Sequence, residues 1–175
     1  MKILLIGPQG SGKSTQGKLL AEFLQIPYIS TGDIFRQIAA KETEEGKKIK
    51  QTIESGYLVD DQTTADLLEK RIKEADCQNG FILDGYPRNL EQVKFIPVLN
   101  FDKVLYISVP EQEVVERLLK RGRPDDTEEG VKRRLNLYRE QTQPLLDYYK
   151  VQGTLIEIDG TGDIQKVQDE IKKSI

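Results

Sequence analysis

Hydrophobic residues in this chain of 175 residues fall into two kinds of segment that alternate along the sequence. Short runs of consecutive apolar residues, such as Ile3-Leu4-Leu5-Ile6, are typical of strands that are buried on both faces of a sheet. Longer segments repeat their apolar residues at helical spacing, as Ile164, Val167, Ile171 and Ile175 do near the C-terminus. The alternation predicts an α/β protein with a parallel sheet.

The same pattern predicts where the elements lie. Strands are expected at residues 2–6, 27–29, 81–84, 103–109 and 154–158. Helices are expected at residues 13–24, 32–41, 45–55, 63–75, 90–99, 111–121, 128–151 and 163–175. Residues 30–61 and 122–132 are rich in charge and poor in strand signal, so we expect them to form mobile lobes over a binding site.

Composition narrows the possible functions. The net charge is −3, from 26 basic and 29 acidic residues, which gives no support to a nucleic-acid partner. No apolar run approaches the roughly 18 residues of a membrane span, so no membrane association is expected. Cys77 is the single cysteine, which excludes a disulfide within the chain and favours a cytoplasmic location. The sequence has no histidine, which excludes a histidine zinc ligand, a Ser-His triad and a histidine general base.

The stretch Gly7-Pro8-Gln9-Gly10-Ser11-Gly12-Lys13-Ser14 matches the pattern G-x-x-x-x-G-K-[ST] and lies between a predicted strand and a predicted helix. Its glycines let successive backbone N–H groups point at an anion, and the N-terminus of the helix adds positive charge. Lys13 would reach the β- and γ-phosphates, and the Ser14 hydroxyl would help to hold Mg²⁺. The stretch therefore predicts a site for a nucleoside triphosphate.

A carboxylate follows another buried strand, in Phe81-Ile82-Leu83-Asp84. Asp84 can serve Mg²⁺ through water, or it can cap the turn that follows. The phosphate loop elsewhere in the same chain favours the metal role.

Arginines gather in the second half of the chain. They are Arg117, Arg121, Arg123, Arg133, Arg134 and Arg139, and they are preceded by Arg36 and Arg88. A single surface arginine usually makes a weak solvated pair. A group of guanidinium donors, however, suits a reaction that must hold two polyanions in line and neutralise a moving phosphoryl group.

Several motifs follow one another from Gly7 to Gly162. They are the phosphate loop, Ser30-Thr31-Gly32-Asp33 with Arg36, Gly56-Tyr57-Leu58-Val59, Asp84-Gly85-Tyr86-Pro87-Arg88 with Gln92, Arg117 through Arg121 to Arg123-Pro124-Asp125-Asp126, Arg134, and Asp159-Gly160-Thr161-Gly162. Together they resemble the adenylate kinases of the nucleoside monophosphate kinase family, in a short-lid form. The Asp-Gly-Tyr-Pro-Arg segment is the most diagnostic of them.

The resemblance implies a P-loop nucleoside triphosphate hydrolase-like three-layer fold. Its five-stranded parallel sheet would have the order 2-3-1-4-5, with helices on both faces. Residues 1–175 would form one kinase domain with an inserted lobe for the nucleoside monophosphate at residues 30–59 and a short lid loop at residues 122–132. The family's four-cysteine zinc lid is absent, and a monomer is expected by default.

The resemblance also implies the site residues. The ATP-binding set would be Gly10, Ser11, Gly12, Lys13, Ser14, Thr15, Arg117, Arg121, Gly160 and Gly162. The AMP-binding set would be Thr31, Arg36, Tyr57, Leu58, Val59, Gly85, Tyr86, Pro87, Arg88, Gln92, Arg123 and Arg134. The catalytic set would be Lys13, Arg88, Arg121, Arg123 and Arg134. Ser14, Thr15 and Asp84 would serve Mg²⁺ through water.

Three positions depart from the family pattern. The family usually has glycine at Ser14, followed by the threonine that matches Thr15, so either hydroxyl can serve Mg²⁺. Gln9 and Asp60 each stand where the family often has proline, and neither change removes a phosphate ligand.

The activity implied is reversible, Mg²⁺-dependent transfer between ATP and AMP that gives two ADP. A UMP or CMP kinase is the main alternative, although pyrimidine-specific relatives tend to lack the residues matching Thr31 and Gln92. A nucleotide-binding regulatory protein without turnover is a second alternative, which the retention of Lys13, Asp84 and the arginines disfavours. A GTP switch is disfavoured because the sequence has no guanine-reading Asn-Lys-x-Asp motif.

Overall fold

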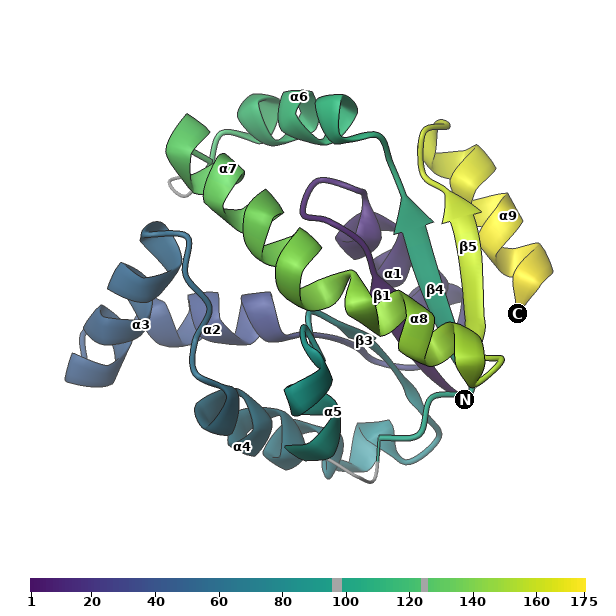
Figure 1. The fold of residues 1–175 in the computed structure, drawn as a ribbon. Coiled ribbons are helices and arrows are strands. Elements are labelled where there is room, and N and C mark those ends of the chain that lie inside the picture. The colour runs from purple at the N-terminus through teal and green to yellow at the C-terminus, as the bar shows by residue number, and fades with distance from the viewer. Residues whose placement is uncertain (96–98, 124–125) are drawn as a thin grey trace.

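A five-stranded parallel sheet forms the centre of the protein, in a computed structural model that describes residues 1–95, 99–123 and 126–175 (Figure 1). The strands are β1 (Lys2–Ile6), β2 (Tyr28–Ser30), β3 (Phe81–Asp84), β4 (Lys103–Ser108) and β5 (Leu155–Asp159). They lie in the order β2-β3-β1-β4-β5, and every pair is parallel. The fold class and the strand order are therefore confirmed.

Helices cover both faces of the sheet, which makes three layers. On one face lie α1 (Lys13–Leu24) and α9 (Ile164–Ser174), and on the other lie α4 (Asp61–Ile72), α5 (Leu90–Phe95) and α8 (Pro144–Val151). Successive residues of β1 point to opposite faces, so Leu5 packs in the cluster with Leu20, and Leu4 packs in the cluster with Leu68. This double burial is why residues 3–6 of the strand are all apolar.

Two further parts project from these layers. The helices α2 (Thr31–Ala39) and α3 (Glu44–Glu54) extend to the left in Figure 1 and contact each other. The helices α6 (Glu111–Arg121) and α7 (Glu128–Leu137) share a small apolar cluster of Val114, Leu118, Val131 and Leu135. A 3₁₀ turn, η1 (Ala75–Cys77), precedes β3.

The predicted helix at residues 128–151 is wrong in one respect, because it is interrupted. Between α7 and α8 lies a π-helical segment, η2 (Tyr138–Thr142), so the long path in front of the sheet in Figure 1 is three segments. Pro144 has no N–H and cannot make the α-helical hydrogen bond to residue 140, and the helix rearranges just before it.

The segment predicted as a lid loop, residues 122–132, is also partly helical. α7 begins at Glu128 because the Thr127 hydroxyl caps it, accepting from the N–H of Gly130 at 3.1 Å. Residues 124–125 of that segment, and residues 96–98 of the helix predicted at 90–99, lie outside the described residues.

Asp60, which departs from the family pattern, has a structural role as the N-cap of α4. Its carboxylate accepts from the N–H of Thr63 at 2.9 Å and caps α4, so this helix begins at Asp61, two residues before its predicted start. Hydrogen bonds from Thr63 lower the pKa of Asp60. Across the described parts of the chain, no helix is long and apolar enough to cross a membrane.

Candidate active site

A cavity of about 910 Å³ opens at the carboxyl ends of the strands. It lies where β3 and β4 flank β1, so the chain leaves the sheet in opposite directions on the two sides of the phosphate loop. All ten residues predicted to bind ATP line this main cavity: Gly10, Ser11, Gly12, Lys13, Ser14, Thr15, Arg117, Arg121, Gly160 and Gly162. Asp84 lines it as well.

The phosphate loop has the backbone geometry of an anion cradle. Gly10 and Gly12 have φ angles of 86° and 96°, which residues with a Cβ rarely adopt. Gly12 is also the residue that precedes α1, so the first N–H groups of that helix face the same place. The loop therefore combines backbone donors with a helix N-terminus, as a polyphosphate requires.

Lys13 supplies the positive charge of the loop. Its ammonium group donates to two carbonyl oxygens of the loop, at 2.6 and 2.8 Å. Burial lowers the pKa of Lys13 to about 8, although Asp84 acts in the opposite direction. A polyphosphate bound in the main cavity would stabilise the protonated form of Lys13, and the positive charge of that form would in turn attract the polyphosphate.

Asp84, at the end of β3, meets the phosphate loop. Its Oδ2 accepts hydrogen bonds from the Ser14 hydroxyl at 3.2 Å and from the Tyr28 hydroxyl at 2.6 Å. Burial, and then the neighbouring Asp84 charge, raise the pKa of Tyr28 well above its usual range.

These oxygens fit Mg²⁺. A hydroxyl and a carboxylate lie side by side at the cavity wall, and both are hard oxygen ligands. Thr15 lines the same cavity, so its hydroxyl stays a second candidate. Among the described residues no group of three or more His, Cys, Asp or Glu side chains comes together, and Mg²⁺ typically needs only one or two carboxylates beside waters and phosphates.

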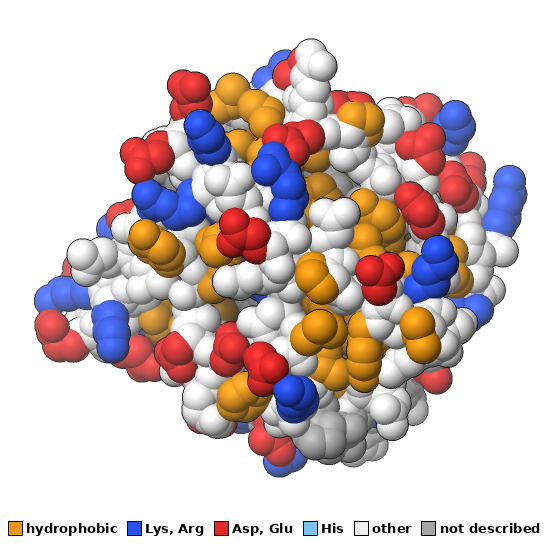
Figure 2. Space-filling view, viewed as in Figure 1, with side chains coloured by type: hydrophobic (Ala, Val, Ile, Leu, Met, Phe, Trp, Pro, Cys, Tyr) orange, Lys and Arg blue, Asp and Glu red, His pale blue; other side chains and the backbone are white. Residues whose placement is uncertain are grey.

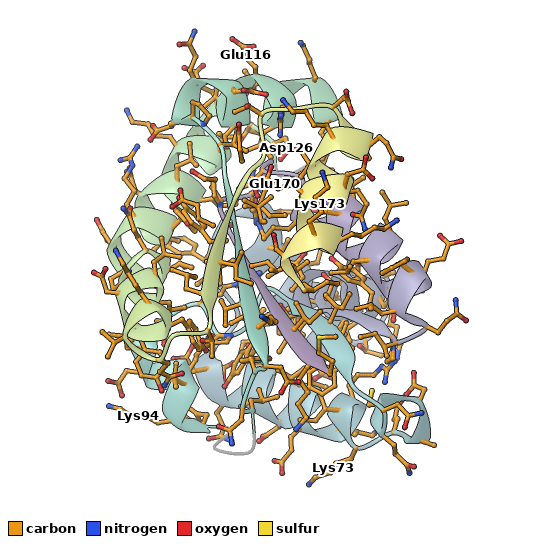
Figure 3. The ribbon with its side chains drawn as sticks, turned by 90° about the vertical axis from the view of Figure 1, so that its right-hand side faces the viewer. Lys73, Lys94, Glu116, Asp126, Glu170 and Lys173 are labelled. Carbon is orange, nitrogen blue, oxygen red and sulfur yellow. The ribbon has the colours of Figure 1, made fainter. Side chains whose placement is uncertain are left out.

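Asp126 brings three of the predicted catalytic arginines together. Its carboxylate accepts from Nε and Nη2 of Arg121 at 2.8 and 2.7 Å, from Nη2 of Arg134 at 2.9 Å and from the backbone N–H of Arg123 at 3.1 Å. Figure 3 shows Asp126 in the interior below α6, and Glu116 of that helix pointing outward. Burial acts to raise the pKa of Asp126, but the hydrogen bonds from Arg121 and Arg134 outweigh it, so the pKa lies below its usual value.

Of the other arginines, Arg117 lies at the main cavity and Arg139 lies on the surface. Arg117 donates to the carbonyl of Gly160 at 2.9 Å, which joins two segments predicted to bind ATP. Arg139 instead makes an exposed pair with Glu111. On the face shown in Figure 2, basic and acidic side chains are interspersed.

A smaller cavity, of about 60 Å³, adjoins the main one under α2 and α3. Four residues predicted to bind AMP line the smaller cavity and not the main one: Thr31, Tyr57, Val59 and Gln92. Leu58 lines both cavities. Arg36, Gly85, Arg88 and Arg134 line both cavities, and Pro87 and Arg123 line the main one.

Gly85 allows the close packing at this junction. Its φ is 90°, and a Cβ there would lie 2.5 Å from Oγ1 of Thr31 and 3.2 Å from Nη2 of Arg88. Arg88 is held by its own Nε, which donates to the Gly85 carbonyl at 2.7 Å, and by Thr142, whose hydroxyl donates to the Arg88 carbonyl at 2.7 Å. A side chain at Gly85 would therefore force the Thr31 hydroxyl to shift and would crowd the Arg88 guanidinium.

Gln92 is buried, and its amide orientation is determined by two partners. Oε1 accepts from the N–H of Arg88 at 2.7 Å, and Nε2 donates to Asp61 at 2.6 Å. Tyr86, also predicted to bind AMP, lines neither cavity: its side chain is buried in the core, and its hydroxyl donates to the Gln92 carbonyl at 2.8 Å. Tyr86 therefore supports Gln92 from behind.

Four residues of this network carry no predicted role from the sequence. They are Tyr28, Asp61, Asp126 and Thr142. Asp126 stands within a quoted motif, and its position beside the arginines was a usable signal. The other three act through partners distant in sequence, which no local pattern indicates.

A phosphate loop after the first strand of a 2-3-1-4-5 parallel sheet, faced by a carboxylate and converging arginines, defines a P-loop kinase of the type that acts on small nucleotides. The family model described as adenylate kinase matches residues 5–154. This chain belongs to the adenylate kinase family.

Relatives with that name match nearly the whole chain. An adenylate kinase of Corynebacterium urealyticum is 43% identical, over 97% of this chain and 96% of its own length. Adenylate kinase 1 of Nostoc sp. is 43% identical, over 99% of this chain and 98% of its own length. An adenylate kinase of Methanosarcina barkeri is 40% identical, over 98% of this chain and 97% of its own length.

Proposed function

We propose that this protein transfers the γ-phosphoryl group of ATP to AMP, reversibly and with Mg²⁺, to give two ADP. The observation that carries the proposal is the junction of the two cavities, since Arg36, Arg88 and Arg134 line both. A triphosphate on the phosphate loop and a monophosphate in the smaller cavity would meet at these guanidinium groups. The established family of the chain supports the same reaction.

The cationic groups have distinct proposed roles. Arg36 and Arg88 would grip the acceptor phosphate, whereas Lys13, Arg121, Arg123 and Arg134 would surround the phosphoryl group in transfer. Phosphoryl transfer needs little covalent help, so positioning and charge neutralisation by these groups would supply most of the rate enhancement.

Mg²⁺ would be held through Ser14 or Thr15 and through Asp84, with waters between. When bound, the metal would supply positive charge that neutralises the charge developing on the phosphates during transfer. Asp84 and the hydroxyls would orient the waters around the metal, and Lys13 would bind the same phosphates.

Gln92 would select adenine. An amide has two N–H donors and two acceptor lone pairs, and Arg88 and Asp61 use one of each. One donor and one acceptor are therefore left for the adenine edge, in an orientation that the two partners keep from flipping. Thr31 and the backbone of residues 57–59 would complete the nucleoside pocket.

The lobe at residues 30–59 and the lid segment at residues 122–132 would close over the bound nucleotides. Closure would exclude water, which otherwise competes with AMP for the phosphoryl group. The lobe is the larger of the two segments and is expected to make the larger movement.

The test is a coupled assay with ATP and each of AMP, UMP, CMP and GMP. Turnover with AMP at least tenfold above the others, and its loss in EDTA, is expected. Preference for UMP or CMP would indicate the pyrimidine kinase instead, and nucleotide binding without turnover would indicate a regulatory protein.

A further inference from the structure

Tyr28, in β2, reaches across to the carboxylate at the end of the next strand. Its hydroxyl lies 2.6 Å from Oδ2 of Asp84, although the register of the two strands pairs Tyr28 with Ile82 and Ser30 with Asp84. The side chain thus extends two residues along the sheet to make this hydrogen bond. Tyr28 lines neither cavity, so it can act on a nucleotide site only through Asp84.

Gly17, in the interior of α1, provides the space for the ring. A Cβ at Gly17 would lie 2.6 Å from Cε2 of Tyr28, 2.9 Å from Cδ2 of Tyr28 and 2.6 Å from Cδ1 of Leu5. Glycine inside a helix is less favourable than alanine. At this position it permits close contact between the helix backbone and the tyrosine ring, so Gly17 and Tyr28 act as a matched pair.

The hydrogen bonds to Asp84 are asymmetric. Both donors in the described structure, Tyr28 and Ser14, donate to Oδ2, while the residue itself lines the main cavity. A carboxylate that is tied by one oxygen presents the other in a defined direction. Hydrogen bonds of this kind orient metal-binding carboxylates, and their loss typically costs 10–100-fold in metal affinity or activity.

We propose that Tyr28 is a positioning residue that holds the Asp84 carboxylate for Mg²⁺, an inference that rests on the proposed role of Asp84. Gly17 is also needed for this role, because the absence of a side chain there allows the Tyr28 ring to lie where it does. A role confined to joining β2 to β3 would lower stability alone, whereas the positioning role changes how strongly Mg²⁺ enhances ATP binding.

The first test is Tyr28→Phe, which removes the hydroxyl and keeps the ring. ATP affinity is measured by calorimetry across a Mg²⁺ titration and in EDTA. We expect the Mg²⁺ concentration for half-maximal enhancement of ATP binding to rise about tenfold, with ATP affinity in EDTA unchanged within about twofold. Tyr149→Phe is the matched control, because Tyr149 is a buried tyrosine of the core that lines neither cavity.

The second test is Gly17→Ala, which displaces the ring without removing the hydroxyl. It should raise the Mg²⁺ requirement as Tyr28→Phe does, and it should add nothing to that requirement in the Tyr28→Phe background. Wild-type Mg²⁺ dependence in both folded single variants would overturn the inference. If ATP binding and turnover of the wild-type protein did not depend on Mg²⁺, the role of Asp84 itself would be overturned. Failure of the Asp84 role can therefore be told apart from failure of the Tyr28 role.

Discussion

The guanidinium of Arg133, in α7, lies over the ring of Tyr57, with its central carbon 4.8 Å from the ring centroid. The same guanidinium donates to the carbonyl of Ser55. Close by, a Cβ on Gly56 would lie 3.4 Å from the carbonyl oxygen of Gly130. The lobe at residues 30–59 therefore rests directly against the first turns of α7, and the two segments proposed to close over the site touch each other.

Arg133→Ala should loosen this contact. An exposed cation–π contact contributes about 0.5–1 kcal/mol, so amides of residues 30–59 should exchange with solvent about two- to fivefold faster. Hydrogen exchange followed by mass spectrometry measures the change. Arg139→Ala, which removes an exposed pair with Glu111, is the control and should leave these amides unaffected.

A bisubstrate mimic, two adenosines joined by five phosphates, extends the same experiment. It should protect both residues 30–59 and the described lid residues in the wild type, and less so in Arg133→Ala. Protection of the phosphate loop alone would exclude closure of the two segments together.

Lys13→Met should lower kcat by on the order of 10³-fold, which corresponds to about 4 kcal/mol of transition-state stabilisation.

ATP binding to the wild-type protein should depend on pH, because the pKa of Lys13 is about 8. The protonated form of Lys13 binds the polyphosphate, so ATP affinity should fall as pH rises above 8. Calorimetry from pH 6.5 to 9.5 should show a decline that approaches about tenfold per pH unit for one linked proton.

The surface variant Lys73→Met is the control for Lys13, since Lys73 lies at the C-terminal end of α4 and makes an exposed pair with Glu69. A loss of less than tenfold in kcat for Lys13→Met would contradict its catalytic role.

The sequence predicted the strands well because a doubly covered strand must be apolar throughout, as Ile3 to Ile6 are. The strand order came with the family resemblance, since periodicity carries no information on which strands are neighbours. The residues of the phosphate loop were predictable because one short segment contains them all. The contact of Tyr28 with Asp84 was not, because it spans 56 residues and depends on the missing side chain of Gly17. The break at Tyr138 was not predicted either, although Pro144 in the sequence was a usable signal for it.

Asp126→Asn should destabilise the protein near neutral pH. The Asp126 side chain is fully buried and that of Arg134 is only 7% exposed, so loss of the charge weakens charge-assisted hydrogen bonds worth about 1.5–3 kcal/mol. Because folding lowers the pKa of Asp126, its contribution is present above the unfolded value of about 3.9 and is lost as pH falls through the folded pKa.

Urea unfolding of both proteins at pH 7 and at pH 3 checks this. The difference in unfolding free energy should be largest at pH 7 and should shrink at pH 3. A difference that is the same at both pH values would show that shape rather than charge matters at this position.

Gln92→Leu should separate the two nucleotide sites. The substitution removes the donor and acceptor proposed to pair with adenine, which costs about 1–3 kcal/mol and should raise KM for AMP with little change in KM for ATP. It also deprives Asp61 and the N–H of Arg88 of their partners, so thermal unfolding of the variant is measured beside its kinetics. Gln62→Leu, an exposed change on α4, is the control for loss of an amide. Because Gln92 lines the smaller cavity and not the main one, an equal rise in KM for both nucleotides would contradict the assignment of AMP to the smaller cavity.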